Sequence, residues 1–113
     1  MVIEDDSETR ELLVDALRDE GFAVFASDEG GKAIELATVI APSVVLLDLE
    51  MPGMDGRTFL RRRRAIERLA DTPVVVITGS AVTGVQADAI FRKPLQIPDV
   101  LDAVRRLQRR QRS

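Results

Sequence analysis

The feature that most constrains this chain is a regular alternation of short apolar runs with segments of helical periodicity. Five runs are rich in β-branched or apolar residues and predict strands: Met1 to Ile3, Phe22 to Ala26, Ser43 to Leu47, Pro73 to Thr78 and Ala89 to Arg92. Four other segments carry apolar residues at three- and four-residue spacing: Leu12 to Leu17, Ala33 to Ile40, Phe59 to Ala70 and Val100 to Leu107. Strand and helix therefore alternate, which predicts a parallel sheet covered by helices on both faces.

The length of 113 residues suits one domain, residues 1–113, built around one hydrophobic core. We expect an α/β fold of the flavodoxin-like kind, a doubly wound five-stranded parallel sheet in the order 2-1-3-4-5. The link between the fourth and fifth strands, Gly79 to Ala87, is shorter than the roughly 10–12 residues that a parallel crossover with its helix usually needs. This link also contains two glycines and shows no apolar stripe. The fourth helix is therefore predicted to be shortened or absent.

Composition restricts the chemistry that the chain can perform. There is no cysteine and no histidine, which excludes disulfides, thiolate nucleophiles, zinc fingers and imidazole bases. The 45% of apolar and 31% of charged residues are typical of a globular protein. Reactive groups must then come from carboxylates, hydroxyls, lysine and arginine.

The charge distribution gives no general attraction to nucleic acid or anionic lipid, because the net charge is −3. Two segments, Arg61 to Arg64 and the tail after Val104, are locally basic. No aromatic residues are interleaved with them for base stacking, so we interpret both as solvated helix faces and predict no direct nucleic-acid binding. No apolar run approaches the ~20 residues of a membrane span, and we expect a cytoplasmic location without membrane contact.

Polar side chains follow the same end of four predicted strands. They are Glu4, Asp5 and Asp6 after the first strand, Asp48 after the third, Thr78 after the fourth and Lys93 after the fifth. Open parallel sheets bind ligands outside the carboxyl ends of their strands, and in the order 2-1-3-4-5 the first and third strands are neighbours. All four groups are therefore predicted to meet in one pocket.

The acidic members of this group suit a hard cation. Mg²⁺ binds through one or two carboxylates and retains water, so Glu4, Asp5 and Asp48 are candidate ligands. The alternative is that Asp6 or Ser7 caps the first helix and the other acids favour its positive N-terminal dipole.

The other members of the group also have two interpretations. Asp48 is a candidate for a buried carboxylate beside a cation, or simply begins a turn. Lys93 is one of only two lysines among 16 basic residues, so arginine is the usual cation of this chain. A lysine at this position therefore favours a functional need for a compact ammonium group, and the alternative is a chance lysine on the surface. Thr78 is a candidate hydroxyl donor, or a β-branched residue that suits a strand end.

The order and spacing of these motifs resemble the receiver domains of bacterial two-component response regulators over nearly the whole chain. The segments that carry the resemblance are Val2-Ile3-Glu4-Asp5-Asp6, Val44 to Gly56 with Asp48 and Met51-Pro52-Gly53-Met54-Asp55-Gly56, Ile77-Thr78-Gly79, and Lys93-Pro94. The most specific of them are Leu47 to Gly56 and the Lys93-Pro94 pair.

The resemblance implies a signalling switch and not a conventional enzyme, one that catalyses only its own phosphorylation and a slow autodephosphorylation. Asp48 would accept a phosphoryl group from a sensor histidine kinase or phosphotransfer protein, and Thr78 and Lys93 would contact that group. Mg²⁺ would be bound by Asp5 and Asp48, by Glu4 largely through water, and by the main-chain carbonyl of Glu50. The resemblance also implies an output domain or partner protein, whose nature the sequence does not specify, and a cis Lys93-Pro94 bond.

This sequence departs from the family at one position, since Ile90 stands where a Tyr or Phe is common and Phe91 follows it. Ser80 and Glu50 occupy positions that vary in the family and influence phosphate lifetime.

The main alternative function is a receiver-like interaction module that signals without phosphorylation. A haloacid dehalogenase phosphatase would need a second Asp where Glu50 stands. A flavin carrier would need a phosphate-binding loop where the acids follow the first strand.

Overall fold

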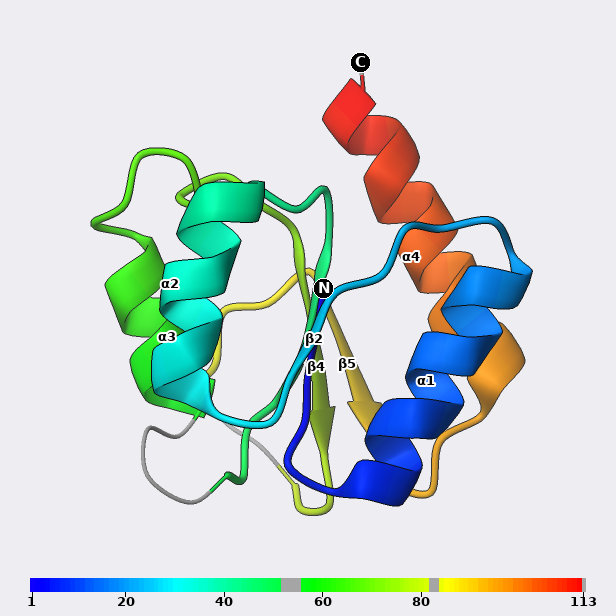
Figure 1. Ribbon diagram of the computed structural model, residues 1–113. Coiled ribbons are helices and arrows are strands. Elements are labelled where there is room, and N and C mark those ends of the chain that lie inside the picture. Colours follow the sequence, from blue (N-terminus) through cyan, green and yellow to red (C-terminus); the bar gives the residue numbers. More distant parts are fainter. Residues whose placement is uncertain (52–55, 82–83, 113) are drawn as a thin grey trace.

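The computed structural model describes residues 1–51, 56–81 and 84–112 and shows a parallel sheet between two layers of helices (Figure 1). The elements follow in the order β1 (Val2–Ile3), α1 (Ser7–Asp19), β2 (Ala26–Ser27), α2 (Gly30–Ile40), β3 (Val45–Asp48), α3 (Gly56–Arg63), β4 (Val74–Thr78), β5 (Ala89–Arg92) and α4 (Ile97–Arg112). The predicted turn at residues 52–55 lies outside the described residues.

The sheet has five parallel strands in the order β2-β1-β3-β4-β5, as predicted. Val2 of β1 pairs with both Ala26 of β2 and Leu46 of β3, so β1 lies between strands that are distant in sequence. β4 pairs with β3 from Val74 beside Val45 to Ile77 beside Asp48, and its ladder with β5 is equally long. Because all strands run the same way, their carboxyl ends meet at one edge of the sheet.

The core is divided by the sheet into two clusters. Successive strand residues point to opposite faces, so Val45 and Leu47 pack on the side of α2 and α3, whereas Val44 and Leu46 pack on the side of α1 and α4. Figure 1 shows these two helix pairs on opposite sides of the sheet. Both faces of β3 and β4 are therefore apolar, which explains why their sequences are continuous hydrophobic runs.

The first helix has clear signals at both ends. The Asp6 carboxylate accepts a hydrogen bond from the Thr9 amide at 3.0 Å, which makes Asp6 the N-cap of α1. After the helix, Gly21 has φ of 90°, and the amides of Gly21 and Phe22 donate to the carbonyls of Arg18 and Leu17. This is a glycine-dependent C-terminal motif, and it confirms the helix end predicted from the sequence.

Two boundaries differ from the predictions. The second strand was expected over Phe22 to Ala26, but it begins only at Ala26, because the Phe22 amide is used by the cap of α1. The third helix was expected to continue to Ala70, yet it ends at Arg63. The Arg63 guanidinium donates to the carbonyls of Leu69, Ala70 and Thr72 and holds the following turns against the helix. Ile66 and Leu69 still reach the core from these turns, which accounts for the helix-like apolar spacing.

The link between β4 and β5 contains no helix in its described residues, 79–81 and 84–88. The helix labelled α4 is the one after β5. The link is fixed by Asp88, whose carboxylate accepts a hydrogen bond from the Val74 amide at 2.8 Å and whose own amide donates to the Val74 carbonyl at 2.9 Å. Over these described residues the crossover contains no helix, which agrees with the prediction from the link length.

Candidate functional site

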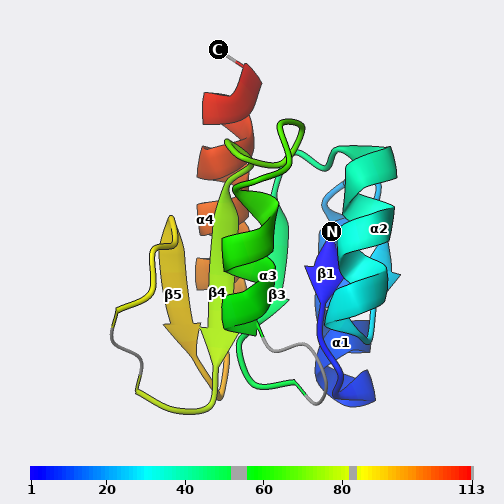
Figure 2. The same cartoon turned by 90° about the vertical axis from the view of Figure 1, so that its left-hand side faces the viewer.

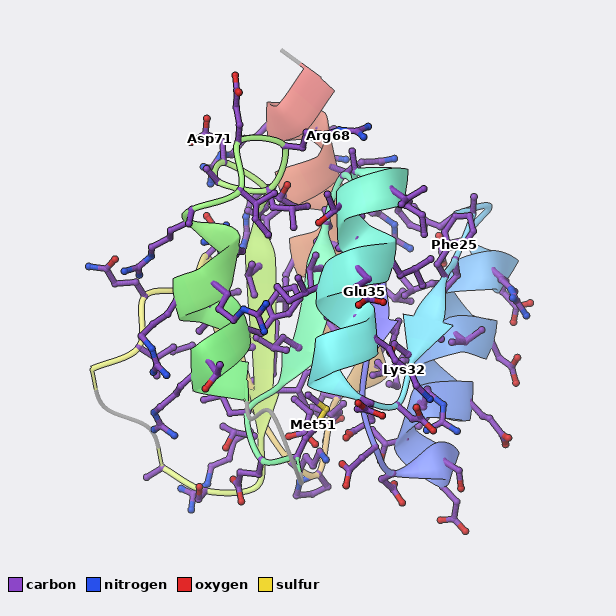
Figure 3. The ribbon with its side chains drawn as sticks, turned by 60° about the vertical axis from the view of Figure 1, so that its left-hand side comes forward. Phe25, Lys32, Glu35, Met51, Arg68 and Asp71 are labelled. Atoms are coloured by element: carbon purple, nitrogen blue, oxygen red, sulfur yellow. The ribbon has the colours of Figure 1, made fainter. Side chains whose placement is uncertain are left out.

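Four polar groups meet at the carboxyl edge of the sheet, as the sequence predicted. Glu4 follows β1, Asp48 ends β3, Thr78 ends β4 and Lys93 follows β5. In Figure 3 the labelled Met51 marks this end of the molecule, whereas Arg68 and Asp71 lie beyond the opposite ends of the strands. The parallel topology therefore gathers into one site residues that are up to 89 positions apart in the chain.

The site is unusual because two of its acids, Glu4 and Asp48, are buried. Glu4, Asp48 and Thr78 are 0%, 2% and 1% exposed. Burial of a carboxylate is costly unless a positive charge compensates it. Lys93 supplies that charge, with its Nζ atom 2.7 Å from Glu4 Oε1 and 3.8 Å from Asp48 Oδ2. The sequence predicted an ammonium near Asp48, but it did not reveal that Lys93 lies closer to Glu4.

A cation would fit beside these acids. Glu4, Asp5 and Asp48 each offer a carboxylate oxygen, and these oxygens lie within 4.8 Å of one another. Glu4 Oε2 is buried and has no hydrogen-bond partner among the described residues. An unsatisfied buried carboxylate oxygen next to two other acids is the donor set that a hard divalent cation prefers. The role of the Glu50 carbonyl as a further ligand stays a prediction.

The protonation of Asp48 reflects this environment. Burial, reinforced by the neighbouring Glu4 carboxylate, raises the pKa of Asp48 to about 6. Burial alone would lower the pKa of Lys93. The neighbouring Glu4 and Asp48 carboxylates stabilise the ammonium and outweigh this effect, so the net result is a raised pKa. A positive charge brought to the site would oppose the rise in the Asp48 pKa and favour the carboxylate, which is the nucleophilic form.

The carboxylate of Glu50 accepts a hydrogen bond from the Thr78 hydroxyl, a contact that the sequence did not indicate. Glu50 Oε1 accepts a hydrogen bond from Thr78 Oγ1 at 2.8 Å and another from Ser80 Oγ at 2.7 Å. These two donors hold the pKa of Glu50 below its usual value. The Glu50 amide also donates to Asp48 Oδ1 at 2.9 Å. Glu50 thereby connects Asp48 to Thr78. The family resemblance implied its carbonyl as a metal ligand and an influence on phosphate lifetime, but it did not indicate these hydrogen bonds.

Arg10 also belongs to the support of the site and was not predicted. Its Nη1 atom donates to the carbonyl of Glu4 at 3.0 Å and to that of Asp5 at 3.3 Å. These bonds fix the backbone that carries two of the acids. Asp6, in contrast, is the N-cap of α1, which confirms that alternative for this residue, whereas metal binding by Glu4 and Asp5 stays a prediction.

At the edge strand, the Lys93-Pro94 peptide bond is cis, as the resemblance implied. Ile90 is 47% exposed, and Phe91 packs against the core on the side of α1 and α4. The aromatic residue therefore points to the opposite side of β5 from Ile90.

Comparison with known proteins agrees with this geometry. The chain matches the response regulator receiver domain over residues 1–105. It belongs to the receiver domain family of two-component response regulators. This chain is 34% identical to the DNA-binding dual master transcriptional regulator RpaA of Synechocystis sp. over an aligned region that covers 97% of the chain and 48% of RpaA. It is 28% identical to sporulation initiation phosphotransferase F of Bacillus subtilis over 94% of the chain and 90% of that protein.

Solved receiver structures share the fold. A CheY-like receiver domain protein from Methanospirillum hungatei JF-1 has a TM-score of 0.86 and 28% identity, covering 99% of this chain and 94% of that one. The chemotaxis protein CheY4 of Vibrio cholerae has a TM-score of 0.87 at 23% identity, with 94% of each chain covered. This receiver spans about half the length of RpaA and of several other transcriptional regulators that it matches.

Among the described residues, no helix has the length and apolar character needed to cross a membrane.

Proposed function

We propose that this receiver is a phosphorylation-dependent switch that accepts a phosphoryl group on Asp48. The donor is a phosphohistidine of a sensor kinase or phosphotransfer protein. Mg²⁺ is held by Asp5 and Asp48, with Glu4 and the main-chain carbonyl of Glu50 completing the site. The output is delivered to a further domain or partner protein.

The observation that carries the proposal is the position of the Asp48 carboxylate. It is buried at the end of β3, 3.8 Å from the Lys93 ammonium and within 4.8 Å of carboxylate oxygens of Glu4 and Asp5. A turn-forming aspartate needs neither the lysine nor the acids. A nucleophile that must approach a phosphoryl group needs positive charge on both sides of the transferred oxygens.

The chemistry is the attack of one Asp48 carboxylate oxygen on the phosphorus atom. The P–N bond to the donor imidazole breaks, its electron pair stays with the imidazole nitrogen, and an acyl phosphate forms on Asp48. Bound Mg²⁺ would supply positive charge to the phosphoryl oxygens. Lys93 would contact one of these oxygens as a point charge, and the Thr78 hydroxyl would donate a hydrogen bond to another. Water later cleaves the acyl phosphate and restores the carboxylate.

The test is intact-mass analysis after incubation with acetyl phosphate and Mg²⁺, which needs no knowledge of the kinase. The wild-type protein should gain the mass of one phosphoryl group. Asp48→Asn should fold and remain unlabelled, because the nearly isosteric amide is not a nucleophile. Asp15→Asn, an exposed substitution on α1, is the matched control and should label like the wild type.

An unlabelled wild-type protein would favour the alternative, a receiver-like module that binds its partners without phosphorylation. Labelling of Asp48→Asn at the wild-type level would instead move the acceptor to another residue.

A further inference from the structure

A groove beside α3 contains a row of arginines that the proposed function does not use. Arg57, Arg61 and Arg64 are exposed and line a cavity of about 180 Å³ together with Leu60, Val85 and Gln86. The spacing of four and three residues places the three guanidinium groups on one side of this segment. We call this cavity the α3 groove.

The groove lies between α3 and the described end of the β4–β5 link, which contributes Gly84, Val85 and Gln86 to its lining. In the described part of the link, residues 84–88 run without helical structure into β5. Figure 2 shows α3 on one face of the sheet, with β5 next to β4. Val85 packs against the core cluster on the α3 side, and Leu60 is 5% exposed. The groove therefore has an aliphatic floor and a cationic rim.

The rim charges are not neutralised within the described residues. Arg57 forms no ion pair there, Arg61 donates only to Thr58 Oγ1 at 3.1 Å, and Arg64 donates only to Gln86 Oε1 at 2.8 Å. Arg63, the next arginine in the run, is different, because it serves the fold through three backbone carbonyls. Within the part of the chain that the structure describes, three forked cationic groups thus have no carboxylate partner and could bind carboxylates in a bidentate manner.

We infer that the α3 groove binds an acidic helical segment of a partner protein. The matching segment carries carboxylates at positions i, i+4 and i+7, the same spacing as that of Arg57, Arg61 and Arg64, which all line the groove although Arg64 directly follows α3. It also carries an aliphatic side chain that enters the groove over Leu60 and Val85.

The shape and charge favour this occupant over other anions. The cavity, about 180 Å³, is smaller than the roughly 300–1,000 Å³ of small-molecule pockets and suits a single side chain. None of the residues that line it is aromatic, so bases would find no stacking surface. The net charge of −3 also opposes a long polyanion while it permits a short acidic segment.

The experiment uses the full chain and a labelled alanine-based helical peptide with glutamates at i, i+4 and i+7 and a leucine at i+3. A peptide of the same composition with its glutamates distributed around the helix is the reference probe. Fluorescence anisotropy should show saturable binding that prefers the ordered peptide. Arg57→Gln combined with Arg61→Gln should weaken that binding roughly tenfold, since two charge pairs are lost.

The matched control combines Arg18→Gln with Arg106→Gln, which removes the same charge from exposed positions on α1 and α4. This control should bind the ordered peptide within about twofold of the wild type, because a distant exposed charge contributes little. Thermal melting of all variants checks that each is folded.

Four results would overturn the inference. They are the absence of saturable binding, equal binding of the two peptides, equal loss in both double variants, and tighter binding of a single-stranded oligonucleotide than of the peptide. A further result would also overturn the inference by identifying a second copy of the chain as the occupant. Helix α1 carries an acidic row of its own: Glu8, Glu11, Asp15 and Asp19. Self-association in sedimentation velocity that disappears in Arg57→Gln with Arg61→Gln would make that row the occupant instead.

Discussion

Two side chains of the site, those of Thr78 and Lys93, have partners that compete with the proposed phosphoryl group. The Thr78 hydroxyl is bound to the Glu50 carboxylate, and Lys93 is closer to Glu4 than to Asp48. A phosphoryl group on Asp48 would have to draw both groups away from these carboxylates. The resting contacts therefore oppose the active arrangement, and their removal should favour it.

The Glu50 carboxylate provides a direct test of this competition. Glu50→Ala leaves Thr78 and Ser80 without their acceptor, so the Thr78 hydroxyl no longer has to break a charge-assisted hydrogen bond before it can contact the phosphoryl group. We expect the variant to bind the phosphoryl mimic beryllofluoride about tenfold more tightly than the wild type, measured by titration calorimetry with Mg²⁺. Glu67→Ala, an exposed substitution after α3, is the control. Unchanged affinity in Glu50→Ala would show that Thr78 is not restrained by Glu50.

The raised pKa of Asp48 predicts how stability changes with pH in the absence of Mg²⁺. The folded protein takes up a proton on Asp48 at about pH 6, whereas the unfolded chain does so near 3.8. The folded state therefore binds more protons between these values, and the free energy of unfolding should fall by about 2 kcal/mol as pH rises from 4 to 6. Asp48→Asn should lack this contribution. Urea unfolding at several pH values measures it, and identical pH profiles of the two proteins would contradict the prediction.

At the residue scale, the sequence predicted which side chains lie in the same site, but not which of them form hydrogen bonds or ion pairs with one another. Strand ends fix the edge of the sheet where Glu4, Asp48, Thr78 and Lys93 lie. The contacts of Glu50 with Thr78, and of Arg10 with the carbonyls of Glu4 and Asp5, depend on the conformation of the loops after the strands. The spacing of apolar residues in the sequence does not predict loop conformation. The only hint for Glu50 was its place two residues after Asp48.

Among the elements, α3 begins at a glycine that packs tightly against the backbone at the end of β3. A Cβ atom on Gly56 would lie 2.6 Å from Leu49 Cα and 2.7 Å from the Asp48 carbonyl oxygen, and neither backbone atom can move without disturbing the site. We expect Gly56→Ala to lower the free energy of unfolding by about 1–3 kcal/mol, as overpacking usually does.

Gly31 in α2 is the matched control for that substitution. The nearest atom to its added Cβ is Glu29 Oε1 at 3.5 Å, an ordinary contact. Gly31→Ala should therefore be neutral or stabilise the helix by up to about 1 kcal/mol, because alanine has the higher helix propensity. Chemical denaturation of both variants gives the comparison, and equal effects would refute the steric explanation for Gly56.

Element boundaries were predicted well where a local signal exists and poorly where tertiary contacts decide. Gly21 and Asp6 mark the ends of α1 through their own backbone and side chain. The end of α3 is set by Arg63, which reaches carbonyls up to nine residues away. Because Ile66 and Leu69 contribute to the core from turns, their spacing alone could not be distinguished from that of a longer helix.

For the whole molecule, the buried acids predict that Mg²⁺ stabilises the fold. A ligand that binds only the folded state at a hundredfold excess over its Kd adds about 2.7 kcal/mol to the free energy of unfolding. We expect Mg²⁺ to raise the Tm of the wild type by several degrees and to raise that of Asp5→Asn much less. Asp19→Asn, an exposed change at the end of α1, should respond like the wild type. An equal rise in Asp5→Asn would exclude Asp5 as a ligand.

The short link between β4 and β5 also affects the order in which the strands of the sheet pair during folding. Val75 pairs with Ala89 only fourteen residues along the chain, whereas Val2 must find Leu46 across forty-four. Loop-closure entropy makes the shorter connection less costly by about 1 kcal/mol. The β4–β5 ladder is therefore the most local contact in the sheet, and contact order favours its early formation. The Asp88 bonds to Val74 would then lock that ladder before β1 is added from the other end of the chain.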